Sequence, residues 1–174
     1  QYNGIWTLQI IDDANQDGGT LDNWALQICV SDYSCNKEVF NTNDDGPGSL
    51  RDAVDCAADG DTITFNPAVH GETIVLGSTL IIDQDVYFQS AVGEQVTLSG
   101  FGLARPFEIQ NGASVEMSGL TILAGTGPDG SGILNHGELL LRDMTIVPAA
   151  ATLFNSLVES SGTLTLEGNC NIEQ

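Results

Sequence analysis

The sequence predicts an all-β protein: a right-handed parallel β-helix (a solenoid), with one short helix in front of it and a hairpin-like pair of strands at the N-terminus. Three observations predict this fold. Strand-like runs of three to five residues follow Ile63, between turns rich in Gly, Asn, Ser and Asp. Residues 49–59 alone have the spacing of an amphipathic helix. Three later segments repeat at intervals of about 24 or 25 residues, as solenoid repeats do.

The repeated segments are 112–122, 136–146 and 161–169. The equivalent aliphatic residues are Val115, Leu139 and Leu164 in one row and Met117, Leu141 and Leu166 in another. One coil cannot bury such a row alone, so stacked coils share a core. A β-sandwich needs no full-turn repeat and is the less favoured fold. In the third segment we expect Asn169 at the position where the other two segments have Met or Leu. We expect Asn171 at the position where they have Ile.

The short helix over residues 49–59 is expected to cap the open end of the stack. Ser49 is a suitable N-cap, because its hydroxyl can accept from free N–H groups of the first turn. Asp52 places negative charge near the positive end of the helix dipole. The residues at helical spacing on one apolar face are Leu50, Ala53, Val54 and Ala57.

The composition limits the range of partners. With 4 basic against 24 acidic residues, the formal charge is −20, which excludes nucleic acid as a partner and disfavours anionic membranes. No apolar run approaches the ~20 residues that span a bilayer, so we expect no membrane insertion. At 174 residues we expect two parts: residues 1–37, a pair of strands and a connector, and residues 38–174, the β-helix.

Cysteine usage and the start of the chain indicate the compartment. The chain begins at Gln1 with no leader, so we expect any signal peptide to have been removed. Cys29 and Cys35 are close enough in sequence to pair across a loop, while Cys56 and Cys170 either pair or stay free. Few lysines and many strands favour an oxidising, extracellular setting.

An Asp- and Asn-rich loop is a candidate calcium site, and calcium is the one cofactor expected. Its alternating oxygen ligands and following glycine match a Ca²⁺-binding loop, although Trp24 stands where the bidentate Glu belongs. The candidate ligands are Asp13, Asn15 and Asp17, with Asp12 or Asp22 as a substitute for the missing Glu. A turn without metal explains the same residues equally well.

Catalysis is not expected. An active site on a β-helix needs clustered carboxylates with a basic residue nearby, and here these groups are scattered along the chain. The basic residues are Lys37, Arg51, Arg105 and Arg142, and the strand glutamates Glu108, Glu116 and Glu138 alternate with apolar residues. His70 and His136 lie in separate turns, so we expect neither a metal pair nor a serine triad built on them.

Two stretches resemble known families. GIWTLQIIDDANQDGGTLDNWALQI, within about residues 1–30, resembles the C-terminal strands of the P domain that follows subtilisin-like proprotein convertases. VFNTNDDGPGSLRDAV and GDTITFNPAVHGETIVLGSTLII, which open residues 38–174, resemble the start of right-handed parallel β-helix domains of the polymorphic-outer-membrane-protein and adhesin type. The second resemblance implies a fold and a bacterial cell-surface or otherwise extracellular setting, and implies no activity.

The leading functional hypothesis is a non-catalytic structural or adhesive module of a secreted bacterial surface protein. In its sharper form the N-terminal strands complete the sheet of a neighbouring copy and build a filament. Expected partners are other copies of itself, further chain of a larger secreted protein, and glycans. One alternative is a non-catalytic tail fragment of a secreted subtilisin-like or other protease. Another is a polysaccharide-binding or polysaccharide-cleaving β-helix, ranked lower because the aromatic residues do not recur at the repeat spacing: Tyr87, Phe101, Phe107 and Phe154.

Overall fold

The computed structural model describes residues 35–100, 105–125, 131–148 and 156–173. The chain divides into two compact units, Gln1–Asp32 and Tyr33–Gln174. The hairpin-like strands expected near the N-terminus lie outside the described residues. The fold that follows is that of the described part of the second unit.

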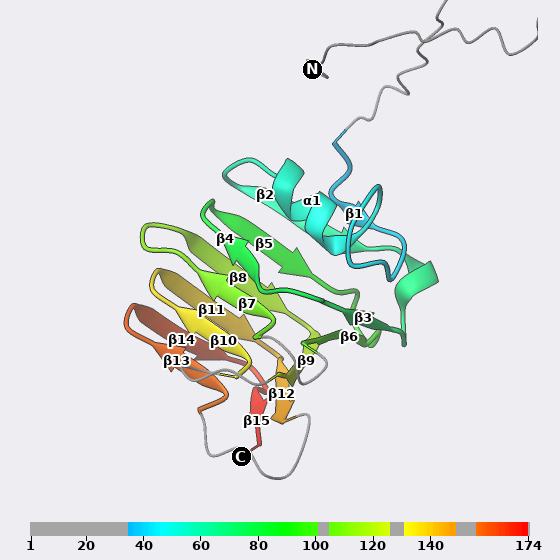
Figure 1. Ribbon diagram of the computed structural model, residues 1–174. Helices are drawn as coiled ribbons and strands as arrows, with labels where there is room; N and C mark the ends of the chain where they lie inside the picture. Colours follow the sequence, from blue (N-terminus) through cyan, green and yellow to red (C-terminus); the bar gives the residue numbers. More distant parts are fainter. Residues whose placement is uncertain (1–34, 101–104, 126–130, 149–155, 174) are drawn as a thin grey trace, which may run out of the picture. The chain divides into compact units, whose positions relative to one another are not determined.

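This unit is a parallel β-helix of about five coils, as the sequence predicts (Figure 1). Each coil gives one strand to each of three parallel sheets in turn. The first sheet contains β1 (Glu38–Val39), β2 (Asp61–Phe65), β5 (Val86–Gln89), β8 (Ser114–Ser118), β11 (Glu138–Arg142) and β14 (Thr163–Glu167). The second contains β3 (Thr73–Val75), β6 (Val96–Ser99), β9 (Leu120–Ala124), β12 (Thr145–Pro148) and β15 (Asn171–Ile172). The third contains β4 (Leu80–Ile82), β7 (Phe107–Ile109), β10 (Ile133–Asn135) and β13 (Val158–Ser160), and a short 3₁₀ helix, η1 (Pro67–Val69), follows β2.

Interior side chains stack in rows through the coils, because parallel strands in register place like positions one above another. The rows of the first sheet are Ile63, Phe88, Met117, Leu141 and Leu166, and Val86, Val115, Leu139 and Leu164. The predicted equivalence of the three repeats is therefore confirmed. The first row begins two coils earlier than the repeats indicate, at Ile63. The interval from Val86 to Val115 is 115 − 86 = 29 residues, which breaks the period of the later coils.

The prediction that Asn171 takes the place of the repeated Ile is wrong. Asn171 pairs with Thr145, and Ile172 pairs with Ile146, so the apolar row of the second sheet continues into β15. The shift arises at the corner, where three residues separate β14 from β15 but two separate β11 from β12. Asp143 and Gly168 each begin that corner with a positive φ, of 51° and 66°. The extra residue follows Gly168, and Asn169 donates its backbone N–H to the Asp143 carboxylate at 2.8 Å.

The one α-helix of the described residues, α1 (Leu50–Cys56), lies beside β1 and β2 at the first coil, as expected of a cap (Figure 1). Ser49 is its N-cap: the hydroxyl accepts from the backbone N–H of Asp52 at 3.2 Å. The Asp52 carboxylate in turn accepts from the backbone N–H of Gly48 at 3.0 Å, completing a reciprocal cap. The helix residues buried in the same apolar cluster as the coils are Leu50, Ala53 and Val54.

The predicted pairing of Cys29 with Cys35 is wrong: Cys35 forms a disulfide with Cys56, with 5.4 Å between their Cα atoms. Cys56 is the last residue of α1, and Cys35 lies just before β1, so the cap folds the two together. The helix ends three residues before the expected position 59, because the backbone becomes extended at its C-cap, Ala57. Cys29 lies outside the described residues, and Cys170 is free.

One interior position of the third sheet is polar. Asn135 is fully buried and stands in register with Ile109 on one side and Ser160 on the other. Its amide nitrogen donates to the Ser160 hydroxyl and to the carbonyl of Thr163, both at 2.9 Å, and its amide oxygen accepts from the N–H of Gly137 at 3.1 Å. Asn135 therefore ties its own turn to the next coil, and its buried polar atoms are satisfied.

Replacing Asn135 by Ile, the residue type that precedes it in its row at Ile109, is expected to destabilise the fold. In Asn135→Ile the apolar row gains a member, but the Gly137 N–H and the Thr163 carbonyl lose a buried partner, which costs about 2 kcal/mol. Chemical denaturation measures this, with Ile109→Val, expected to cost about 1 kcal/mol, as the control in the same row. An Asn135→Ile variant at least as stable as the native protein would show that the amide is dispensable.

Removing the Cys35–Cys56 disulfide is expected to lower the free energy of unfolding by about 3 kcal/mol, the value typical of a loop of this size. The double variant Cys35→Ser, Cys56→Ser is compared with Cys170→Ser, which leaves the disulfide intact. Mass spectrometry of the unreduced, proteolysed protein should find the peptides of Cys35 and Cys56 linked. A linked Cys29–Cys35 peptide contradicts the assignment.

Candidate functional site

The outer face of the first sheet runs across all the described coils and is a candidate functional surface. Its strands bury every second side chain and turn the others outward. The outward residues form three rows across the coils, of which the shortest is Ser114, Glu138 and Thr163. The two longer rows are Thr62, Tyr87, Glu116, Leu140 and Thr165, and Thr64, Gln89, Ser118, Arg142 and Glu167. We call these two rows the Tyr87 face.

Two adjoining hollows lie on the Tyr87 face, of about 280 Å³ and about 310 Å³. Tyr87 and Glu116 line both, so the tyrosine ring stands at the border between them. Tyr87 is 45% exposed, and its neighbours in the strand, Val86 and Phe88, are buried. The strand therefore fixes the backbone of Tyr87 while its ring remains open to a ligand.

Arg142 lies between two glutamates of neighbouring coils. Its Nη1 is 3.5 Å from Glu116 Oε1 and its Nη2 is 2.8 Å from Glu167 Oε2. The remaining guanidinium nitrogen, Nε, is buried and has no hydrogen-bond partner, and it is the one such side-chain atom found in the described residues. The ion pairs hold the guanidinium in place, and its one positive charge offsets one of the two carboxylate charges.

The two histidines that the sequence placed in separate turns have different partners. His70 Nε2 lies 3.1 Å from the carbonyl oxygen of Phe65, and its Nδ1 lies 3.5 Å from Glu94 Oε2, beside a hollow of about 550 Å³. His136 Nδ1 lies 2.7 Å from the hydroxyl of Ser161. Within the described ranges, no carboxylate is bonded to the other ring nitrogen of His136.

The contact between His136 and Ser161 was not expected from the sequence. Each is the first residue of its repeat segment, so the repeat alignment carries the signal that could have found it. The hydrogen bond joins equivalent turns of adjacent coils. Its role in the structure is to hold successive coils together at this corner.

In the turn before α1, the side-chain oxygen atoms bond to other groups of the turn and to the helix. Asn41 donates to the carbonyl of Pro47 at 2.9 Å, and its side-chain oxygen accepts from the N–H of Asn43 at 3.0 Å. Asp44 pairs with Arg51 of the helix at 3.0 Å. These contacts hold the turn against the cap.

Asp61 at the start of β2 has a lowered pKa. A hydrogen bond from the backbone N–H of Ala58, and second the ammonium group of Lys37, lower the pKa of this carboxyl below its usual value. The Ala58 N–H lies 2.8 Å away and Lys37 Nζ 3.2 Å away, both on the same carboxylate oxygen. These interactions hold the turn between α1 and β2.

The expected calcium ligands lie outside the described residues: Asp12, Asp13, Asn15, Asp17 and Asp22. Calcium binding there remains a prediction. Within residues 35–100, 105–125, 131–148 and 156–173, no group of three or more His, Cys, Asp or Glu side chains is arranged to hold a metal ion. In the same residues, no helix is long and apolar enough to cross a membrane.

Comparison with known proteins identifies one family at the N-terminus. Residues 1–28 match the proprotein convertase P-domain family, in agreement with the resemblance noted in the sequence. Neither the curated proteins nor the solved structures include a significant match to this chain. The P-domain match and the intramolecular disulfide indicate a secreted or extracellular protein that joins P-domain-like residues to a β-helix.

Proposed function

We propose that the chain is a non-catalytic structural module of a secreted bacterial surface protein, and that it assembles by accepting a β-strand from a neighbouring copy. The observation that carries this proposal is the uncovered face of the coil formed by β13, β14 and β15. There Leu164 is 37% and Leu166 50% exposed, although each continues a row that is buried in every earlier coil.

The edge of β14 can receive a further strand. In the described residues β14 pairs with β11 on one side alone, so its other edge presents unpaired backbone N–H and C=O groups. A strand with apolar side chains at alternate positions would cover Leu164 and Leu166 and extend the sheet. Burying those side chains supplies the main driving force, about 25 cal/mol for each Å² of apolar surface removed from water.

Within the described residues the first and last coils differ, which favours head-to-tail assembly. At the first coil, α1 covers the interior, and Leu50, Ala53 and Val54 are buried. Coil-on-coil stacking through that end is therefore blocked. The sequence offers a donor of the required pattern in residues 24–28, Trp-Ala-Leu-Gln-Ile, within the segment that matches the end of a P domain. A heterologous contact of this kind repeats without closing and gives a filament.

The proposal that the module is non-catalytic is supported by the pairing of its charged groups. Glu116 and Glu167 both face Arg142, Asp44 faces Arg51, and Asp61 faces Lys37. These pairs join coils, turns and the cap. Their geometry accounts for Lys37, Arg51 and Arg142 without a reaction.

A second candidate function is favoured by the P-domain match. A P domain follows the protease domain in proprotein convertases, so the chain could belong to the non-catalytic tail of a secreted protease. In that case residues 1–28 would complete a P domain within their own polypeptide. They would then not be available to a neighbouring copy.

The assembly proposal predicts that a charge on the uncovered coil prevents association. We expect the purified chain to form fibres in electron micrographs, and Leu166→Glu to remain monomeric, because a carboxylate cannot be buried beneath an added strand. Ile81→Glu is the matched control: Ile81 is 57% exposed on β4, away from β14, and its replacement should leave the fibres intact. Deletion of residues 1–30 should also abolish them.

Two outcomes of this experiment contradict the proposal. A native chain that stays a monodisperse monomer in light scattering at high concentration favours the protease-tail function. Fibres that persist in both Leu166→Glu and the deletion variant would place the contact elsewhere on the molecule. Thermal denaturation of each variant confirms that the β-helix itself is folded.

A further inference from the structure

We propose that the Tyr87 face binds a neutral oligosaccharide. This site is separate from the β14 edge and does not depend on assembly. It uses the outward residues of β2, β5, β8, β11 and β14, whereas assembly uses the free backbone edge of β14 and the inward rows that end at Leu164 and Leu166. Two features of the face carry the inference: its shape and its balance of polar groups.

The shape fits an extended ligand. The hollows of about 280 Å³ and about 310 Å³ adjoin at Tyr87 and Glu116, so a chain molecule can occupy both. Each alone is at the small end of known ligand sites, and together they are well within that range. Neighbouring strands are about 4.8 Å apart, so Tyr87 and Leu140, two strands from each other in one row, offer apolar surfaces about 10 Å apart.

The polar groups fit a ligand rich in hydroxyls. Around the exposed ring of Tyr87 stand hydroxyl, amide and carboxylate groups that can donate and accept hydrogen bonds: Thr62, Gln89, Glu116, Ser118 and Thr165. The apolar face of a sugar ring can stack on an aromatic ring such as that of Tyr87 while its hydroxyls bond to the groups around it.

The charges of the face disfavour an anionic ligand. Arg142 is the one basic residue that lines the two hollows, and Glu116 and Glu167 already face it. An anionic ligand would therefore meet no free cation here, and it would be repelled by a chain of formal charge −20. A basic peptide is the competing partner, because Glu138 also lines the first hollow while Glu116 is engaged by Arg142, and hexalysine is therefore one of the probes.

The test is calorimetric titration of the full chain with defined probes, in buffer that contains EDTA so that metal ions bridge no ligand. The neutral probes are cellohexaose, xylohexaose, mannohexaose and laminarihexaose, and the charged comparisons are hexagalacturonate and hexalysine. We expect at least one neutral probe to bind, and neither charged probe to bind more tightly. Tyr87→Ala should weaken the binding about tenfold, because an exposed aromatic ring that stacks on the ligand is removed.

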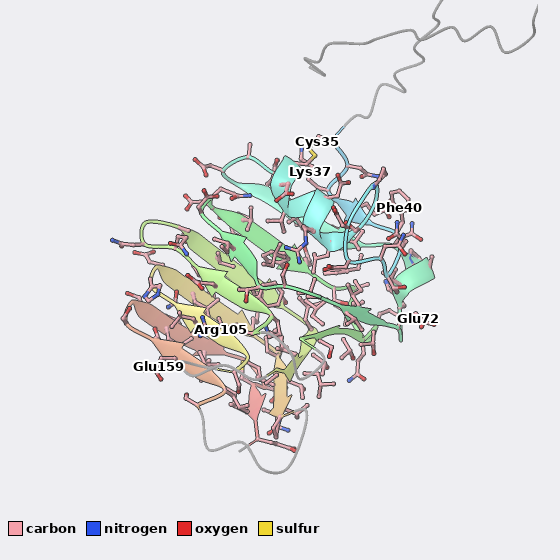
Figure 2. The ribbon with its side chains drawn as sticks, viewed as in Figure 1. Cys35, Lys37, Phe40, Glu72, Arg105 and Glu159 are labelled. Atoms are coloured by element: carbon pink, nitrogen blue, oxygen red, sulfur yellow. A yellow bond between two sulfur atoms is a disulfide. The ribbon has the colours of Figure 1, made fainter. Side chains whose placement is uncertain are left out.

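Phe40→Ala is the matched control for Tyr87→Ala. Phe40 is 42% exposed, nearly as much as Tyr87, and lies beside the cap rather than on the Tyr87 face (Figure 2). Its replacement should leave the dissociation constant unchanged. A second variant, Leu140→Glu, places charge in the same outward row as Tyr87 and should also weaken binding. Circular dichroism melting of all three variants establishes that each is folded.

Three results would overturn the proposal. The first is no measurable binding of any of the four neutral hexasaccharides. The second is binding that Phe40→Ala weakens as much as Tyr87→Ala does. The third is tighter binding of hexagalacturonate or hexalysine, which would assign the face to a charged partner. All of these variants keep the β14 edge intact. Fibre formation can therefore be measured independently of oligosaccharide binding, and the two proposals can fail separately.

Discussion

The whole molecule depends on keeping parallel strands in register from coil to coil. When the register holds, inward side chains stack in continuous rows and each strand shares its backbone hydrogen bonds with the coils on either side. A slip of one residue in any strand would turn its apolar row to the solvent. The corners maintain the register, because Asp143 and Gly168 adopt the left-handed conformation and the extra residue after Gly168 is taken up before β15 begins.

The same geometry explains why the ends of the stack matter more than its middle. An interior coil is covered on both sides, whereas each terminal coil exposes one side. At the first coil the chain covers its own interior with α1, held by its reciprocal cap and by the Cys35–Cys56 disulfide. At β14 the described residues provide no such cover, and Leu164 and Leu166 are exposed. Outward positions carry little of this burden.

Much of the fold could be predicted from the sequence because the rows are built from recurring aliphatic residues. The equivalence of Val115, Leu139 and Leu164 follows directly from the 24- or 25-residue period. The first coils were harder to align, because a longer interval separates β5 from β8. The disulfide could not be predicted, since closeness in sequence favoured Cys29, whereas the short helix brings Cys56 to Cys35. The Tyr87 face was missed because its members come from separate coils, and only the register places them side by side.

The register itself can be tested most directly by cross-linking. Leu140 and Thr165 face outward at paired positions of β11 and β14, 165 − 140 = 25 residues apart in the chain. Their Cα atoms should be about 4.8 Å apart, within disulfide reach. In a Cys170→Ser background, Leu140→Cys with Thr165→Cys should oxidise to a disulfide that mass spectrometry detects. The offset pair Glu138→Cys with Thr165→Cys should stay reduced, because its Cα atoms lie more than about 7 Å apart. A disulfide in the offset pair, or none in the paired variant, would contradict the stacked coils.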